Sequence, residues 1–254
     1  MECLMKVLVS ITSWSPDKKK YLDMIIEAYS KWTKYIPTIV LAVNYPYETN
    51  VIVIPSIRGG WDHCWNNKEY LQQNYQDYDL IIEQDDDIMI TETNLDYYVT
   101  NQYTLPDYKD KMYPNRIDAN GSPKKYMPGF LVAEGDYLIS LKQPHFPFID
   151  EKFTIGSGYW IVPHIGHSAC FIVDKDRYSI FLKNTDNQPK RIKGHSIGAT
   201  ARTEIYNIFN KMVLVDGIKD KSALVQHLPI KYVNGTPNFN KWKFTTVNTI
   251  DKYL

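Results

Sequence analysis

The chain has 254 residues, of which 44% are hydrophobic and 14% aromatic, enough apolar material to form the core of one large or two small domains. Lysine plus arginine and aspartate plus glutamate both total 29, which excludes the strong net charge that draws a protein to nucleic acid or to an anionic membrane. Any affinity for an anionic ligand must therefore come from a local arrangement of residues.

The cysteines and the apolar runs indicate a cellular location. Cys3, Cys64 and Cys170 are odd in number, far apart and without the spacing of a metal site, which favours a reducing compartment over a disulfide framework. The apolar run near the N-terminus is too short for a signal peptide, and no run approaches the roughly 18 apolar residues of a membrane span. We therefore expect a cytoplasmic protein without a membrane span.

The first third of the chain alternates strand-like and helix-like patterns. Ser15 and Pro16, followed by apolar residues at helical spacing, predict one helix, and the segment 57–75, with Asp62 as a candidate N-cap, predicts another. The apolar runs that predict strands are 7–11, 39–43, 51–54 and 80–82. This order of elements predicts an α/β fold with a mainly parallel central sheet flanked by helices.

The rest of the chain is less regular. Residues 91–153 are rich in Tyr, Pro, Lys and Gly and predict long ordered loops with short strands near 126–133 and 137–141, a portion that shapes a binding site. Residues 167–182 predict a strand followed by a helix. Thr203 is a candidate N-cap for a helix over 204–212, and strands are expected near 213–215 and in ALVQHLP at 223–229.

Three adjacent aspartates, Asp85, Asp86 and Asp87, directly follow a buried strand in LIIEQDDDIMI. They fit a solvated loop, a divalent-cation site or an acid/base pair. Carboxylate oxygens suit Mg²⁺, Mn²⁺ or Ca²⁺, whereas nothing in the sequence separates the pKa values of these neighbours as an acid/base pair requires. Ligands of open α/β sheets bind beyond the carboxyl ends of the strands, which favours the cation site.

The turn Arg58-Gly59-Gly60 precedes the second predicted helix. Free backbone N–H groups at a helix start attract phosphate, and an arginine adds a bidentate donor. The turn lacks the Gly-Lys-Ser/Thr of a Walker loop and the glycine spacing of a dinucleotide fingerprint, so alone it indicates only a tight turn. Beside an acidic metal site, it predicts a phosphate-bearing ligand whose charge the metal neutralises.

These features together resemble the nucleotide-sugar glycosyltransferases of the GT-A fold. The element order followed by an Asp-x-Asp motif in IIEQDDDIMI is their pattern, and SALVQHLP is similar to a late segment that presents a histidine to the metal. Thr203-Glu204 resembles the helix start that supplies the catalytic base of inverting members, although Ile205 stands where that motif has an aspartate.

The resemblance implies roles for individual residues. Asp85 contacts the ribose or the metal ion, Asp87 and His227 bind the metal ion, and Asp86 can exchange roles with either neighbour. Glu204 is the expected base, with Glu134, Asp150 and Glu151 as alternatives, and a retaining reaction would need none. The residues assigned to nucleotide-sugar binding are Thr12, Arg58, Gly60, Asp62, Asp85 and Asp86.

The implied activity is the transfer of a sugar from a nucleotide diphosphate to a hydroxyl of a glycan or glycoconjugate, with inversion as the expected outcome. Mn²⁺ or Mg²⁺ is the expected cofactor, and a UDP-sugar is favoured over a GDP-sugar. We expect one domain over 1–254, with a nucleotide-sugar-binding half at about 1–95 and an acceptor-binding half at about 96–254. The alternatives are a nucleotidyltransferase of related fold and a non-catalytic sugar- or Ca-binding module. A nucleotidyltransferase should have a glycine-rich loop after the first strand, whereas the segment there, ITSWSPDKKK, contains no glycine.

Overall fold

The computed structural model describes residues 4–55, 65–105, 125–142, 149–163, 169–185, 204–229 and 244–253. The chain divides into two compact units. The first unit comprises Met1–Glu92 and Ala169–Ile205, and the second unit comprises Thr93–Ser168 and Tyr206–Leu254. The second unit begins at Thr93, and residues 169–205 belong to the first unit. The expected division into a nucleotide-sugar-binding half and an acceptor-binding half stays a prediction. Within the described ranges, no helix has the length and apolar character needed to cross a membrane.

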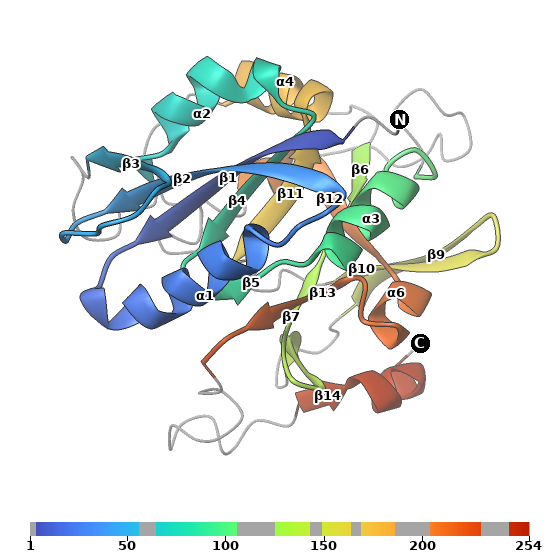
Figure 1. Cartoon of the computed structure of the whole chain (residues 1–254). Helices are drawn as coiled ribbons and strands as arrows, with labels where there is room; N and C mark the ends of the chain where they lie inside the picture. The colour runs from blue at the N-terminus through green and yellow to red at the C-terminus, as the bar shows by residue number, and fades with distance from the viewer. Residues whose placement is uncertain are drawn as a thin grey trace. The chain divides into compact units, whose positions relative to one another are not determined.

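The first unit is built on a five-stranded sheet with the order β11-β4-β1-β2-β3 (Figure 1). Parallel pairs join β1 to β2, β1 to β4 and β2 to β3, and β11 runs antiparallel to β4. The strands are β1 Met5–Ser13, β2 Tyr35–Val43, β3 Ile52–Pro55, β4 Leu80–Asp85 and β11 Cys170–Asp174. The structure confirms the predicted α/β class with a mainly parallel sheet flanked by helices.

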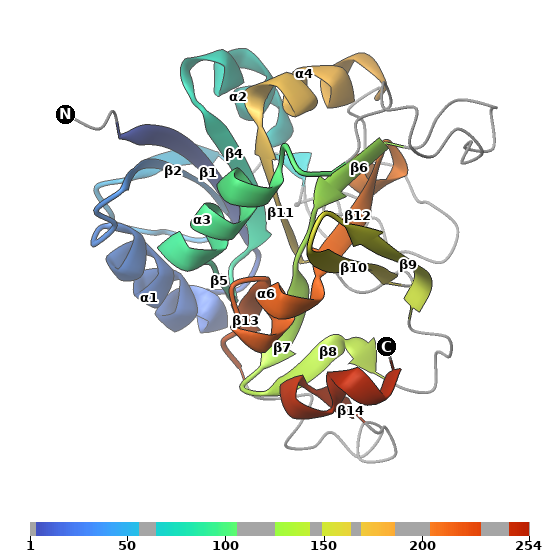
Figure 2. The same cartoon turned by 90° about the vertical axis from the view of Figure 1, so that its right-hand side faces the viewer.

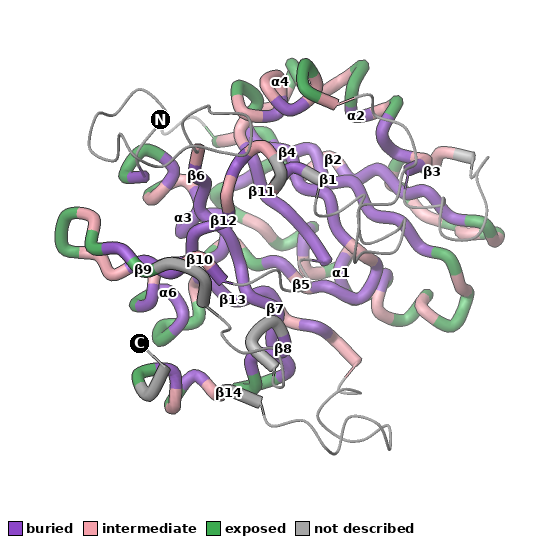
Figure 3. The backbone as a smooth tube through the Cα atoms, turned by 180° about the vertical axis from the view of Figure 1, so that it is seen from behind, coloured by how far each residue is buried: buried purple, intermediate pink, exposed green. Residues whose placement is uncertain are grey.

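Helices cover both faces of this sheet. The short 3₁₀ turn η1 (Pro16–Lys18) leads into α1 (Lys19–Tyr29) on one face, and α2 (Lys68–Asn74, extended by η3, Tyr75–Asp77) and α4 (Lys175–Lys183) lie on the other (Figures 1 and 2). Strands β1 and β4 are therefore buried along most of their length (Figure 3). Burial on both faces explains why they read as continuous apolar runs instead of alternating ones.

The sheet register brings strand ends to one edge. Thr12 pairs with Asp85, and Ser13 pairs with Val43, so the carboxyl ends of β1, β2 and β4 meet there. A turn at Asp86 and Asp87 then leads into the two-residue strand β5 (Ile88–Met89).

The start and end of this turn are tied together by Gln84, whose Nε2 donates to the Ile88 carbonyl at 2.7 Å. Its Oε1 accepts a hydrogen bond from Tyr29 Oη at 2.5 Å, which links the turn to the end of α1. Both bonds are buried, where a broken hydrogen bond is costly, so they fix the backbone that carries the aspartates.

The second unit contains strands in the orders β6-β12-β10-β9 and β14-β8-β7-β13 (Figure 2). The expected short strands near 126–133 and 137–141 are present as β6, β7 and β8. The strands are β6 Lys125–Pro128, β7 Leu131–Glu134, β8 Tyr137–Lys142, β9 Ile149–Ile155, β10 Gly158–Pro163, β12 Phe209–Leu214, β13 Leu224–His227 and β14 Phe244–Thr246. The helical elements are α3 Glu92–Asn101, which starts at the last residue of the first unit, α6 Val215–Lys219 and η5 Val247–Tyr253.

The helix predicted over 204–212 is wrong. Only Glu204–Asn207 is helical, as the 3₁₀ turn η4, and Phe209–Leu214 is the strand β12. That strand pairs parallel with β6 and antiparallel with β10, and Met212 joins a core cluster with Trp160 and Tyr126. The spacing of the apolar residues in this segment is compatible with a helix or a strand. Pairing with β6 and β10, which are distant in sequence, makes it a strand.

Candidate functional site

Polar side chains gather at the carboxyl edge of the sheet in the first unit. Ser13 Oγ donates to Asp86 Oδ2 at 2.6 Å and lies 2.8 Å from Tyr45 Oη. Lys18 Nζ donates to Asp87 Oδ2 and forms an ion pair with it. We call Ser13, Lys18, Tyr45 and Asp85–Asp87 the aspartate edge.

The local sequence accounts for this arrangement. Strand β1 ends at Ser13, and Pro16 begins the 3₁₀ turn that places Lys18 beside the end of β4. Asp85 is the last residue of β4, and its backbone N–H donates to the Ala169 carbonyl at 2.9 Å. The ends of β1 and β4, the 3₁₀ turn η1 and the segment after β2, which carries Tyr45, therefore supply the residues of one small polar site.

Burial and mutual repulsion perturb the charges of the aspartate edge. Asp86 is 8% exposed, and its burial, reinforced by the charges of Asp87 and Asp85, raises its pKa to about 7 even though Ser13 and Lys18 act in the opposite direction. Burial opposes the charged form of Lys18, but its hydrogen bond and charge interaction with Asp87 still raise its pKa. An additional cation would relieve this excess of carboxylate over ammonium.

The raised pKa of Asp86 predicts a pH-dependent stability. The folded protein keeps this proton up to about pH 7, whereas an unperturbed aspartate loses it near 3.8. The folded state then binds more protons between these values, so the free energy of unfolding falls as pH rises through that window.

We expect the free energy of unfolding of Asp86→Asn not to show this fall with pH. At about pH 8 it should exceed that of the wild type by on the order of 3 kcal/mol. Asparagine keeps an oxygen acceptor for Ser13 and the size of the side chain. Urea unfolding at about pH 8 and about pH 4 in a chelating buffer measures the effect. A variant that is no more stable than the wild type at the higher pH would contradict it.

The aspartate edge has donors that suit a hard divalent cation. Asp85 is partly exposed and Asp87 is 7% exposed, and carboxylate oxygens are the ligands that Mg²⁺ and Mn²⁺ prefer. In the part of the chain that the structure describes, no three His, Cys, Asp or Glu side chains converge as a metal centre. Lys18 provides the positive charge beside Asp87 in this arrangement.

Of the remaining predicted site residues, Thr12 is buried in β1 and pairs with Asp85 of the neighbouring strand β4. His227 ends β13 in the second unit, where its Nδ1 lies 2.7 Å from Glu134 Oε1. Glu204 opens η4, and nothing further is described for its side chain. Arg58, Gly60 and Asp62 lie outside the described residues. The metal set Asp85, Asp87 and His227 therefore stays a prediction.

A buried ion pair joins Lys68, the first residue of α2, to Glu83 on β4, two residues before Asp85. Lys68 Nζ donates to Glu83 Oε2 at 2.6 Å, and the two side chains are 2% and 0% exposed. The ammonium also lies 5.4–5.6 Å from the ring centroids of Trp65, Phe171 and Phe181, within the range of cation–π attraction. This pair ties α2 and α4 to the strand that carries the aspartates.

Sequence reasoning missed Ser13, Lys18 and Tyr45 as members of the site. A signal was available, because a residue that ends a parallel strand, or that starts the following helix, lies at the carboxyl edge of the sheet. The predicted strand at 7–11 and the predicted helix start at Ser15 and Pro16 place Ser13 and Lys18 at that edge.

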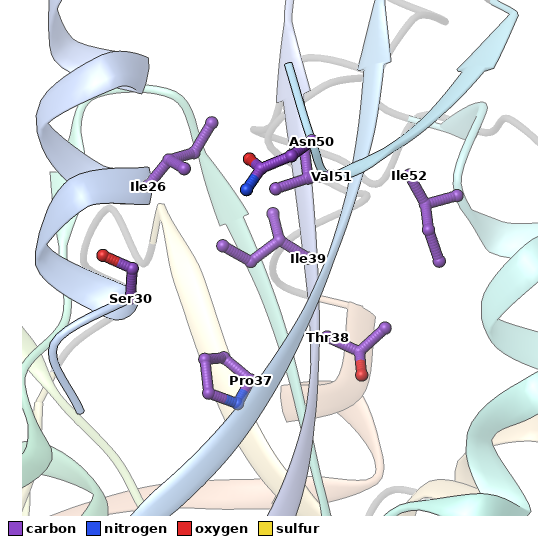
Figure 4. A pocket seen from close by; sticks show the side chains of 8 residues that line it. All are labelled: Ile26, Ser30, Pro37, Thr38, Ile39, Asn50, Val51 and Ile52. Atoms are coloured by element: carbon purple, nitrogen blue, oxygen red, sulfur yellow. The ribbon is translucent and has the colours of Figure 1, made fainter. Parts of the chain in front are cut away.

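A pocket of about 310 Å³ lies elsewhere in the first unit, between the end of α1, the first half of β2 and the start of β3 (Figure 4). Its lining contains no ionisable side chain and no residue of the aspartate edge. The lining residues are Ile26, Ser30, Pro37, Thr38, Ile39, Asn50, Val51 and Ile52. The pocket is therefore separate from the candidate site.

Comparison with known proteins assigns no family to the chain. No protein-family model matches it, and no curated protein matches it. Among solved structures, it is similar to one described as mannose-1-phosphate geranyltransferase from Thermus thermophilus, with 9% sequence identity and a TM-score of 0.39, over 88% of this chain and 74% of that chain. A likeness at this level carries no conclusion about activity.

Proposed function

We propose that this protein is a metal-dependent glycosyltransferase that moves a sugar from a nucleotide diphosphate to a hydroxyl of a glycan or glycoconjugate. UDP is the favoured nucleotide and GDP the alternative. The observation that carries the proposal is the aspartate edge, where Asp86 and Asp87 are buried beside Asp85 at the carboxyl ends of parallel strands. That edge is where open α/β sheets bind their ligands.

The charges of this edge fit the reaction. Departure of a nucleoside diphosphate builds negative charge, and a divalent cation held by Asp85, Asp87 and His227 would stabilise that charge as a Lewis acid. Lys18 supplies a second positive charge at the same edge, on a long flexible stem that is 28% exposed. In a metal–diphosphate complex, Asp87 would thus bind the metal ion and Lys18 would interact with the negative charge of the diphosphate.

Glu204 is the proposed general base, which would accept the proton of the acceptor hydroxyl in an inverting reaction. It opens the 3₁₀ turn η4 directly before β12. Of the alternatives, Glu134 is 2% exposed and bonded to His227, so an acceptor hydroxyl has less access to it. Asp150 and Glu151 lie in β9.

The test is release of nucleoside diphosphate from UDP-sugars and GDP-sugars in the presence of glycan acceptors, whose hydroxyl groups receive the sugar, with Mn²⁺ and with EDTA. We expect release only with the metal and only from one nucleotide class. Glu204→Gln should lower transfer by about 10²-fold or more and leave UDP binding unchanged, whereas Glu69→Gln, on an exposed residue of α2, should change neither. Retained transfer by Glu204→Gln would refute its role as the base. Release of pyrophosphate from a nucleoside triphosphate instead would identify a nucleotidyltransferase.

A further inference from the structure

Two ionisable side chains end neighbouring parallel strands in the second unit. Strand β7 ends at Glu134, and β13 ends at His227, and their register pairs the preceding residues, Ala133 with Gln226. His227 Nδ1 lies 2.7 Å from Glu134 Oε1, and the two side chains are 4% and 0% exposed. The parallel register thus sets a carboxylate and an imidazole side by side inside the unit.

The contact restricts the imidazole ring. A carboxylate can only accept hydrogen bonds, so the contact is satisfied when Nδ1 carries the proton. In a neutral ring the lone pair then lies on Nε2, and the hydrogen bond fixes the direction of that lone pair. Burial strengthens the restriction, because an unpaired polar group inside the unit would be costly.

We propose that Glu134 is a positioning residue that holds His227 as the Nδ1–H tautomer, so that Nε2 is the nitrogen that binds the divalent cation. The identity of the ligand rests on the proposed function, whereas the tautomer rests only on the contact between the two side chains. Histidines that bind metals commonly donate their other ring N–H to a carboxylate, which orients the ring and increases its basicity.

The first measurement is long-range ¹H–¹⁵N NMR of ¹⁵N-histidine-labelled protein without metal, in the neutral form of the ring. The His227 signals are assigned by their loss in His227→Gln. We expect Nδ1 to be protonated in the wild type and in Glu134→Gln, whose amide oxygen can accept the same bond, and both tautomers to be populated in Glu134→Leu. A wild-type ring protonated on Nε2 would overturn the proposal.

The second measurement is Mn²⁺ affinity in the presence of UDP, from the EPR signal of free Mn²⁺. Glu134→Leu should weaken binding by about 10- to 100-fold, and Glu134→Gln should recover most of that loss. The control is Asp136→Asn, which removes a nearby acidic group whose ion pair with Lys221 is exposed, and it should bind as the wild type does. Equal affinity in the wild type and both Glu134 variants would overturn the positioning role.

The two measurements separate the inference from the proposed function. If the wild type binds no Mn²⁺ with any nucleoside diphosphate, the proposed function and the proposed role of His227 as a metal ligand are both refuted. The tautomer, measured without metal, still decides whether Glu134 orients the ring. If Glu134→Leu does not fold, the protonated nitrogen of His227 is determined in the wild type and in Glu134→Gln alone. Protonation on Nε2 in the wild type would still overturn the proposal.

Discussion

Replacing Asp87 by asparagine is expected to weaken Mn²⁺-dependent binding of UDP by about 100-fold or more. The variant lacks the carboxylate that we propose as a metal ligand, and loss of a residue that only supports a metal ligand already costs about 10- to 100-fold. Any weak binding of UDP in EDTA should stay unchanged, since contacts that need no metal do not require the carboxylate at this position. Isothermal titration with UDP, in Mn²⁺ and in EDTA, measures both values. Equal Mn²⁺-dependent affinity in the variant and the wild type would contradict the metal site.

Lys18→Met is the matched variant, because it removes the other member of the same ion pair. Asp87 then loses its ammonium neighbour, so Mn²⁺ meets less competing positive charge. We expect Mn²⁺ affinity without nucleotide to rise several-fold, an effect of about 1 kcal/mol for a partly exposed pair. Opposite signs for the two variants support a cation site, whereas a similar loss in both would indicate that the ion pair only stabilises the fold.

Lys68→Met is expected to lower the free energy of unfolding by about 3–5 kcal/mol, because it leaves the Glu83 carboxylate buried without its ammonium partner. Replacing both residues, as Lys68→Met with Glu83→Leu, removes both buried charges and should cost far less than the single change. Urea unfolding of the wild type, both single variants and the double variant gives the coupling energy between the two positions.

An exposed ion pair serves as the control for the Lys68 and Glu83 variants. Lys31 and Glu27 form an ion pair four residues apart, with side chains that are 68% and 69% exposed. Lys31→Met should change the free energy of unfolding by no more than about 0.5 kcal/mol. A double variant at 68 and 83 that is as unstable as Lys68→Met alone would show that the buried charges are not the cause.

Sequence patterns predicted the architecture of the first unit because each of its buried strands and helices has a recognisable pattern of apolar residues within its own segment. The buried parallel strands β1 and β4 appear as continuous apolar runs, and the helix between β1 and β2 appears at helical spacing. The position of Asp85–Asp87 at the sheet edge follows from the strand that precedes them. Strand order and the antiparallel partner β11 require pairing information that no single segment contains.

The residues around the aspartates were harder to predict, because their contacts join distant parts of the chain. Ser13 bonds to Asp86 and Lys18 to Asp87 across about 70 positions, and only the register of β1 with β4 brings them together. The contact of His227 with Glu134 likewise depends on the pairing of β13 with β7. Strand β12 was mistaken for a helix because its partners β6 and β10 decide its conformation.

The central claim is that the aspartate edge binds a divalent cation together with a nucleoside diphosphate. Thermal unfolding of the wild type with Mn²⁺ alone, UDP alone, both together and both with EDTA tests it most directly, with GDP in a parallel series. A ligand present at about 100 times its dissociation constant adds about 2.7 kcal/mol to the free energy of unfolding, which raises Tm measurably. We expect a clear rise only when metal and nucleotide are both present, and its loss in Asp87→Asn. No rise with Mn²⁺ and either nucleotide, or an equal rise in EDTA, would contradict the claim.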